Sequence, residues 1–171
     1  SLPLVFLLFS LTPPQTYALP IFITLRELRL LDTRVGLALV YLAFSLPLPI
    51  WFLSQYFKSI PREFEDSAKV DGCGRFQVIF RIVFPLAAPA LSTSAIFAFM
   101  HTWNEFFFAS ILTSRQAITM PVAIMNFQDS RAMAWDLSTA ASMLAVVPLV
   151  IILTVLQRYV IQGLTAGGIK G

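Results

Sequence analysis

The sequence has few of the residues that build most active sites and most soluble surfaces. It contains one cysteine, Cys73, and one histidine, His101, and only 12% of its 171 residues are charged. One cysteine excludes a disulfide within the chain, and one cysteine with one histidine cannot form a Cys/His metal centre. The basic residues are scattered rather than gathered in a stripe with aromatic side chains, as nucleic-acid binding would favour. We therefore expect no metal, no cofactor and no nucleic-acid partner.

Apolar residues, in contrast, are abundant. They make up 57% of the chain, and the mean hydropathy is +0.78. A water-exposed surface of this character would aggregate, whereas a lipid bilayer is a natural solvent for it. Four stretches, roughly 2–25, 35–57, 82–112 and 137–160, have the length of a helix that crosses about 30 Å of hydrocarbon. The sequence predicts an all-α, polytopic membrane helix bundle, with 1–171 forming a single transmembrane domain.

Every predicted span contains proline, which removes a backbone donor from a helix. The first stretch is the weakest, because Pro13, Pro14 and Pro20 divide it into two short pieces. In a membrane, neighbouring helices can supply the missing hydrogen bonds. Two interpretations stay open: kinked helices that pack tightly, or deformable helices that line a pathway which must open.

The loops between the spans differ slightly in charge. With four spans, residues 26–34 and 113–136 share one side, and the connection 58–81 and the tail 161–171 share the other. The first side holds five basic residues, and the second holds seven when Arg158, at the end of the fourth span, is counted with the tail. Basic residues concentrate on the cytoplasmic side of a membrane, so the connection 58–81 and the tail are predicted to be cytoplasmic.

The connection 58–81 is patterned for two short helices. Ser59 and Pro61 are typical of a helix start, and acidic residues follow in the first turns, where the helix dipole favours them: Glu63, Glu65 and Asp66. Gly72 and Gly74 end that helix, and a second one is predicted to begin near Arg75 and lead into the third span. From these residues alone, the connection is either a docking element for a soluble partner or a cap that rests on its own bundle.

The stretch from Glu63 to Pro85 reads EFEDSAKVDGCGRFQVIFRIVFP. It resembles the EAA loop of ABC importer permeases, whose pattern is EAA, three residues, G, nine residues, I, one residue, LP. Asp66-Ser67-Ala68 matches EAA, Gly72 the glycine, Ile82 the isoleucine and Phe84-Pro85 the last pair, with three mild substitutions. Three further segments are similar to the carbohydrate-importing, maltose-type branch: RLLDTRVGLALVYLAFSLPLPIWFL, IFAFMHTWNEFFFA and QRYVIQGLTAGGIKG.

The resemblance implies a transport mechanism without chemistry in this chain. In such permeases the EAA loop forms a coupling helix that docks on a cytoplasmic ABC ATPase dimer, while an extracytoplasmic solute-binding protein delivers the sugar. It also implies a second permease subunit, usually giving a heterodimer, and a bacterial inner-membrane location. Family members have six spans, so this chain would begin in the third. The expected ATPase-coupling residues are Glu63, Asp66, Ser67, Ala68, Asp71, Gly72, Ile82 and Pro85.

A second group of candidate residues lies late in the third apolar run. Glu105 is the only acidic residue there, beside Trp103 and Asn104 and one turn after His101. A charge in hydrocarbon is costly, so such a residue usually faces a cavity or a partner, although it can also mark an interfacial helix end. These four residues are therefore candidates for the translocation path or for contact with the binding protein.

Two other functions remain open at this point. One is an ion-coupled secondary transporter, with Glu105 as the coupling carboxylate. The other is a truncated permease fragment that lacks two spans and does not function. The chain contains no glycine-rich loop of the Walker type and no nucleophile–base–acid set, so we do not expect it to be an enzyme.

Overall fold

The computed structural model describes residues 12–61, 63–128 and 135–168, and for residues 128 and 156–168 it describes the backbone alone. The elements are, in order, the 3-10 helix η1 (Pro14–Tyr17), α2 (Ala18–Glu27), α3 (Arg34–Ser45), α4 (Pro47–Ser59), α5 (Glu63–Val70), α6 (Arg75–Val78), the π-helical turn η2 (Ile79–Val83), α7 (Phe84–Trp103), α8 (Phe107–Leu112), α9 (Met120–Gln128) and α10 (Trp135–Gly168). No strand occurs within these ranges. The predicted all-α class is confirmed.

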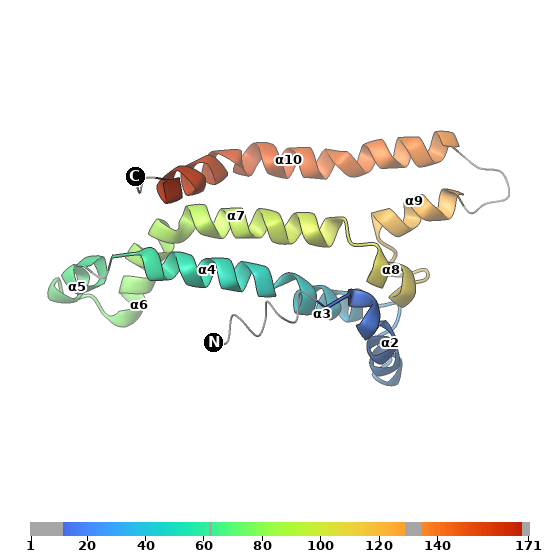
Figure 1. Cartoon of the computed structure of the whole chain (residues 1–171), viewed down its shortest axis with the longest axis horizontal. Coiled ribbons are helices and arrows are strands. Elements are labelled where there is room, and N and C mark those ends of the chain that lie inside the picture. Colours follow the sequence, from blue (N-terminus) through green and yellow to red (C-terminus); the bar gives the residue numbers. More distant parts are fainter. Residues whose placement is uncertain (1–11, 62, 129–134, 169–171) are drawn as a thin grey trace.

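Three long helices lie along the length of the molecule (Figure 1). Helix α7 is in the middle and packs against both α4 and α10. The stretches Arg75–Trp103 and Trp135–Val155 are long and apolar enough to cross a membrane, and α3 with α4 qualifies as one span that is bent by 46°. These helices correspond to the second, third and fourth predicted spans.

The bend between α3 and α4 follows from two prolines. Pro47 and Pro49 have no N–H group, so the carbonyls of Ala43 and Ser45 lose the donors that a continuous helix would give them. Both proline rings are buried. The bend is therefore held by packing, as sharp helix kinks at proline usually are.

The centre of the bundle is built from small side chains on α7. Ala87 and Ala90 are 0% and 1% exposed, and Thr93 and Ser94 are also buried. Small residues allow helix backbones to approach closely, which is the usual way that helices associate in lipid. The outward sides of the long helices stay apolar and exposed, notably on α10 at Met143, Leu144 and Val150. This distribution is the one expected of a chain that spans a membrane.

The first predicted stretch is different, because its residues 1–11 lie outside the described part of the chain. Its remainder forms η1 and the ten-residue helix α2, which lies across the long axis of the other helices (Figure 1). Helix α2 ends where Arg29 adopts a left-handed φ of +55°, with the Leu30 amide donating to the Leu25 carbonyl at 2.8 Å. The prolines thus divide this stretch into short pieces, as the sequence indicates.

Three boundaries differ from the sequence-based expectation. The stretch 82–112 is not one helix: it breaks after Trp103, because the Asn104 side chain donates back to the Met100 carbonyl and α8 starts separately. The connection 113–136 is not all loop, because its apolar residues form α9, which packs on α10. Helix α10 also continues to Gly168, through most of the predicted tail.

Candidate functional site

Helices α5 and α6 form one tip of the molecule, beyond the ends of the long helices (Figure 1). We call this region, residues 63–78, the α5–α6 end. Helix α5 closes with a left-handed residue, Gly72, whose φ is +79°. The Gly72 amide donates to the Lys69 carbonyl at 3.0 Å, and the Cys73 amide donates to the Ala68 carbonyl at 2.9 Å. This is the Schellman pattern of helix termination, which favours glycine at that position.

The predicted helix boundaries are partly right. Helix α6 begins at Arg75, as expected, with Gly74 preceding it and the Gln77 side chain accepting from the Gly74 amide at 2.9 Å. The start signal was wrong at Ser59, because that residue ends α4 and its hydroxyl donates to the Tyr56 carbonyl. The hydroxyl satisfies the helix that precedes it, and α5 starts only at Glu63.

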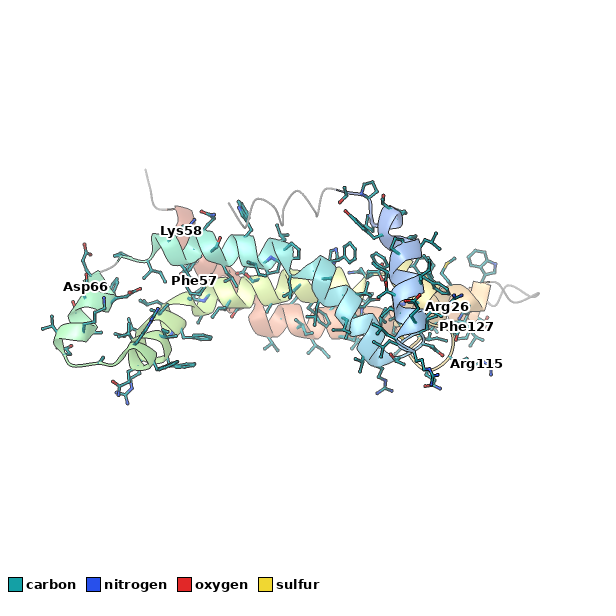
Figure 2. All side chains as sticks on the ribbon, turned by 90° about the horizontal axis from the view of Figure 1, so that it is seen from below. Arg26, Phe57, Lys58, Asp66, Arg115 and Phe127 are labelled. Carbon is teal, nitrogen blue, oxygen red and sulfur yellow. The ribbon has the colours of Figure 1, made fainter. Side chains whose placement is uncertain are left out.

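Most of the expected coupling residues are accessible at this tip. Glu63, Ser67, Asp71 and Gly72 are exposed. Asp66 lies at this tip (Figure 2), where its side chain is 67% exposed and pairs with Lys69 at 2.9 Å. Ala68 is the exception, because it is only 3% exposed. It therefore packs inside the tip and helps to hold its shape, rather than lying on the surface that a partner would contact.

The remaining two coupling candidates belong to the junction with the long helix α7. Ile82 lies in the π-helical turn η2, and Pro85 lies in the first turn of α7. In this π turn the Phe84 amide donates to the carbonyl of Ile79, five residues earlier in the chain. Pro85 has no amide to donate, which explains why the regular ladder is interrupted immediately before it.

The opposite end contains a cavity, which lies beside the break between α7 and α8. Its volume is about 580 Å³, and its lining is mostly apolar. The apolar walls include Phe44, Phe97 and Phe108, and polar groups come from Gln15, His101 and Glu105. Aromatic faces with a few polar groups are typical of a small-molecule site.

The four candidates around Glu105 divide into two pairs. His101 and Glu105 line the cavity. Trp103 instead donates from Nε1 to the Ala145 carbonyl of α10 at 3.2 Å, and it stacks on Phe99. The Asn104 side chain ends α7, as described above. Trp103 and Asn104 thus serve packing and helix termination, whereas His101 and Glu105 face the space that a solute could enter.

Glu105 also has a structural role. Its two carboxylate oxygens accept from the amides of Phe108 and Ala109, at 2.8 and 3.2 Å. These amides are among the first of α8, where no backbone acceptor is available and where the helix dipole favours a negative charge. The acid therefore caps α8, which agrees with the alternative of a helix end.

The sequence analysis missed Asp32, the residue with the most hydrogen bonds at this end. Asp32 lies in the turn 28–33 between α2 and α3, and its carboxylate accepts from four consecutive backbone amides, those of residues 114–117. The Ser114 amide and then the amides of Arg115 and Gln116 hold the pKa of the Asp32 carboxyl well below its usual range. An acid next to a helix start looks like an ordinary surface residue in sequence, because its partners are 82 or more positions away.

No group of three potential metal ligands lies close together in the described ranges. A bundle of apolar helices with a charged tip at one end and a cavity at the other has the architecture of a membrane permease. A model of the family described as binding-protein-dependent transport system inner membrane component matches residues 1–166. The chain belongs to this family.

Curated relatives agree with this assignment. A sulfoquinovosyl glycerol transport system permease protein of Agrobacterium fabrum is 40% identical over 95% of this chain and 57% of its own length. A trehalose transport system permease protein of Mycobacterium tuberculosis is 38% identical over 96% of this chain and 61% of its own. The chain thus spans about three fifths of the length of these relatives.

A solved structure shares the fold. The crystal structure of a bacterial ABC transporter involved in the import of the acidic polysaccharide alginate matches with a TM-score of 0.64 and 25% identity. The match covers 83% of this chain and 55% of that chain. The chain is thus similar in sequence and in helix arrangement to permeases of ABC transporters.

Proposed function

We propose that this chain is a transmembrane permease subunit of an ATP-driven ABC importer for a carbohydrate, in the inner membrane of a bacterium. Its partners would be a cytoplasmic ABC ATPase dimer, a second permease subunit in a heterodimer, and an extracytoplasmic solute-binding protein. ATP hydrolysis takes place in the ATPase, and this chain couples it to alternating access of a cavity to the two sides of the membrane.

The observation that carries this proposal is the form of the α5–α6 end. A short helix with exposed acidic side chains projects beyond the long helices and ends at a left-handed glycine. A second short helix then joins it directly to α7. A soluble partner that grips α5 can therefore move α7 without bending a loose connection. The spacing of Asp66, Gly72, Ile82 and Pro85 along this unit is that of the EAA loop.

The cavity supports a carbohydrate as the cargo. Aromatic faces such as those of Phe44 and Phe97 suit the apolar faces of a sugar ring, while His101 and Glu105 can bond to hydroxyl groups. Two of the relatives are described as sugar-transport permeases, for trehalose and for trehalose/maltose. We propose that this cavity is part of the translocation path.

The proposal is tested by reconstitution. The chain, its partner permease and the ATPase are purified together and placed in proteoliposomes with ATP inside and loaded solute-binding protein outside. Uptake is measured with labelled trehalose, maltose, diacetylchitobiose and sulfoquinovosyl glycerol, the solutes after which relatives are named. If none of these solutes is taken up in an ATP-dependent way, the result counts against the proposal of a carbohydrate importer.

Reversing the charge of Asp66 is expected to uncouple this system. The exposed pair of Asp66 with Lys69 contributes only about 0.2–0.5 kcal/mol, so Asp66→Lys leaves the fold intact. A charged hydrogen bond to a partner is worth about 1.5–3 kcal/mol, so ATPase association and uptake should fall at least about tenfold. Co-purification with the tagged ATPase and initial uptake rates measure this.

The matched control is Lys69→Ala, which removes the same ion pair but keeps the acid. It should behave like the unaltered chain. Equal losses in the two variants would mean that the pair itself matters, and unchanged association in Asp66→Lys would contradict docking at this residue.

The alternative function, an ion-coupled secondary transporter, requires a different role of the Glu105 carboxylate. In that mechanism the carboxylate must bind and release a proton or ion, so Glu105→Gln should abolish uptake. In the ABC importer its main task is to cap α8. Glutamine keeps one acceptor oxygen, so Glu105→Gln should lower stability by about 1 kcal/mol and keep most of the uptake, whereas Glu105→Ala should cost up to about 2 kcal/mol. Thermal unfolding in detergent and uptake, with and without an uncoupler, separate the two mechanisms.

A further inference from the structure

Asp32 is bonded far more extensively than any other acidic side chain in the described part of the chain. Its Oδ1 accepts from the amides of Ser114, Arg115, Gln116 and Ala117, at 2.9, 3.1, 3.1 and 3.3 Å. Its Oδ2 accepts from the Ser114 hydroxyl at 3.0 Å and from the amides of Arg115 and Gln116. In return, the Asp32 amide donates to the Leu112 carbonyl at 2.9 Å.

Four consecutive amides that point at one place form an anion-binding nest. Here the anion is a side chain of the protein itself. Charge-assisted bonds of this kind are about twice as strong as neutral ones. Without the carboxylate, the amides of residues 114–117 would have to find other acceptors. The ionised carboxylate therefore determines the conformation of the segment 114–117.

The bonds join two parts of the chain that are distant in sequence. Asp32 belongs to the turn that leads into α3, and the amides that donate to its carboxylate follow α8. Below this junction, Leu25 of α2, Val40 of α3, and Phe108 and Leu112 of α8 form one buried cluster. Helix α8 is thus fixed at its start by Glu105 and after its end by Asp32. We call α8, the segment 114–117 and the turn 28–33 the α8 plate.

The α8 plate is continuous with the bent span. Thr33 caps α3 by accepting from the Gly36 amide at 3.0 Å, so the turn that holds Asp32 is rigidly connected to α3. Helix α3 leads through the bend at Pro47 and Pro49 into α4, whose far end precedes α5. Figure 2 shows Arg115 of the plate and Arg26 of α2 at the same end of the molecule, opposite to Asp66. Arg26, Arg34 and Arg115 are exposed, and no ion pair involves them in the ranges that the structure describes.

We propose that Asp32 is a positioning residue for transport. It makes the segment 114–117 and the start of α3 move as one body, so that a soluble protein which docks on the α8 plate acts directly on the bent span α3–α4. The inference rests on the proposed function, because it assigns to Asp32 the mechanical link between docking at this end and the coupling helix at the other.

The test measures ATP hydrolysis by the reconstituted transporter with and without solute-binding protein loaded with the best-transported sugar of the panel above. Asp32→Ala should leave assembly and basal hydrolysis unchanged and should reduce the stimulation by loaded binding protein about tenfold. The control is Glu27→Ala, which removes an exposed negative charge from the end of α2 and should keep full stimulation.

A disulfide provides a rescue that a purely structural role would not predict. In a Cys73→Ser background, Asp32→Cys with Ser114→Cys replaces the contact between Oδ2 and Oγ, now 3.0 Å, by a covalent link. Oxidation should restore at least half of the stimulation, and reduction should remove it again. If Asp32→Ala impairs assembly, the oxidised and reduced forms of this pair still decide the question.

Full stimulation in Asp32→Ala, or a disulfide that forms but does not restore it, would overturn the inference. The unaltered transporter tests the proposed function separately. If the unaltered transporter shows neither stimulation nor uptake, the importer assignment is wrong. If it transports, and Asp32→Ala is stimulated equally, the importer assignment stands and only the positioning role of Asp32 is wrong.

Discussion

Replacing Gly36 by alanine is expected to destabilise the α8 plate more than any other single-methyl change. A Cβ atom at Gly36 would lie 2.2 Å from the Leu30 carbonyl oxygen and 3.1 Å from the Thr33 hydroxyl. The contact is with backbone, so no side chain can simply turn away. The turn 28–33 would have to move by about 1 Å or more, and overpacking of this kind costs about 3 kcal/mol.

The consequence should extend beyond α3, because the same turn carries Asp32. Gly36→Ala is expected to lower the unfolding midpoint in detergent by about 6–12 °C. It should also expose the amides of residues 114–117 to faster hydrogen exchange. The matched control is Gly74→Ala, whose Cβ would meet only the Gln77 Oε1 at 3.8 Å. Equal midpoints in the two variants would contradict the close approach of α3 to the Leu30 carbonyl.

Replacing Gly72 by valine is expected to have the largest effect on transport. No atom lies within 4 Å of the position that a Cβ would take, so the cost comes from the backbone alone. At φ +79° a non-glycine residue costs about 1–2 kcal/mol, and a β-branched residue costs more. With a cost of about 2 kcal/mol, the equilibrium constant between the docking direction of α5 and its other directions falls about 30-fold, and affinity for the ATPase falls by up to the same factor.

Gly72→Val should therefore insert into the membrane normally but lose nearly all ATP-dependent uptake. Among the three variants, Gly72→Asn should retain the most uptake, since asparagine tolerates the left-handed region. Uptake by Gly72→Ala should lie between that of Gly72→Asn and that of Gly72→Val. The measurements are membrane abundance, ATPase co-purification and initial uptake. The order glycine, asparagine, alanine, valine is the specific expectation, and an order that followed side-chain size alone would contradict it.

The α5–α6 end is the part that the sequence predicts best, because its signals are local. A helix stop at Gly72, a restart at Arg75 and acids in the first turn depend on residues within a few positions of each other. The error at Ser59 has the same origin. A serine before a proline is equally compatible with the end of one helix and the start of the next, and only the length of α4 decides between them.

The opposite end was predicted less well, because its organisation depends on distant contacts. Glu105 precedes the Phe108 and Ala109 amides by three and four residues, which is the spacing of a helix cap. This spacing becomes informative only when it is known that the helix breaks at Asn104. The role of Asp32 has no local signal at all. Its partners are backbone amides, which carry no sequence pattern, and the segment that presents them is separated from it in the chain by all the helices from α3 to α8.

The π-helical turn η2 gives the spacing of the EAA-like pattern a geometric meaning. A π turn contains one residue more than an α-helical turn, and each residue of a helix advances the direction of its side chains by about 100°. The nine residues between Gly72 and Ile82 include residues of this turn. A chain one residue shorter, with an uninterrupted α-helix, would aim α5 about a quarter of a revolution away around the axis of α7. The number of residues between the glycine and the isoleucine therefore determines the direction in which α5 points, as well as its distance from α7 along the chain.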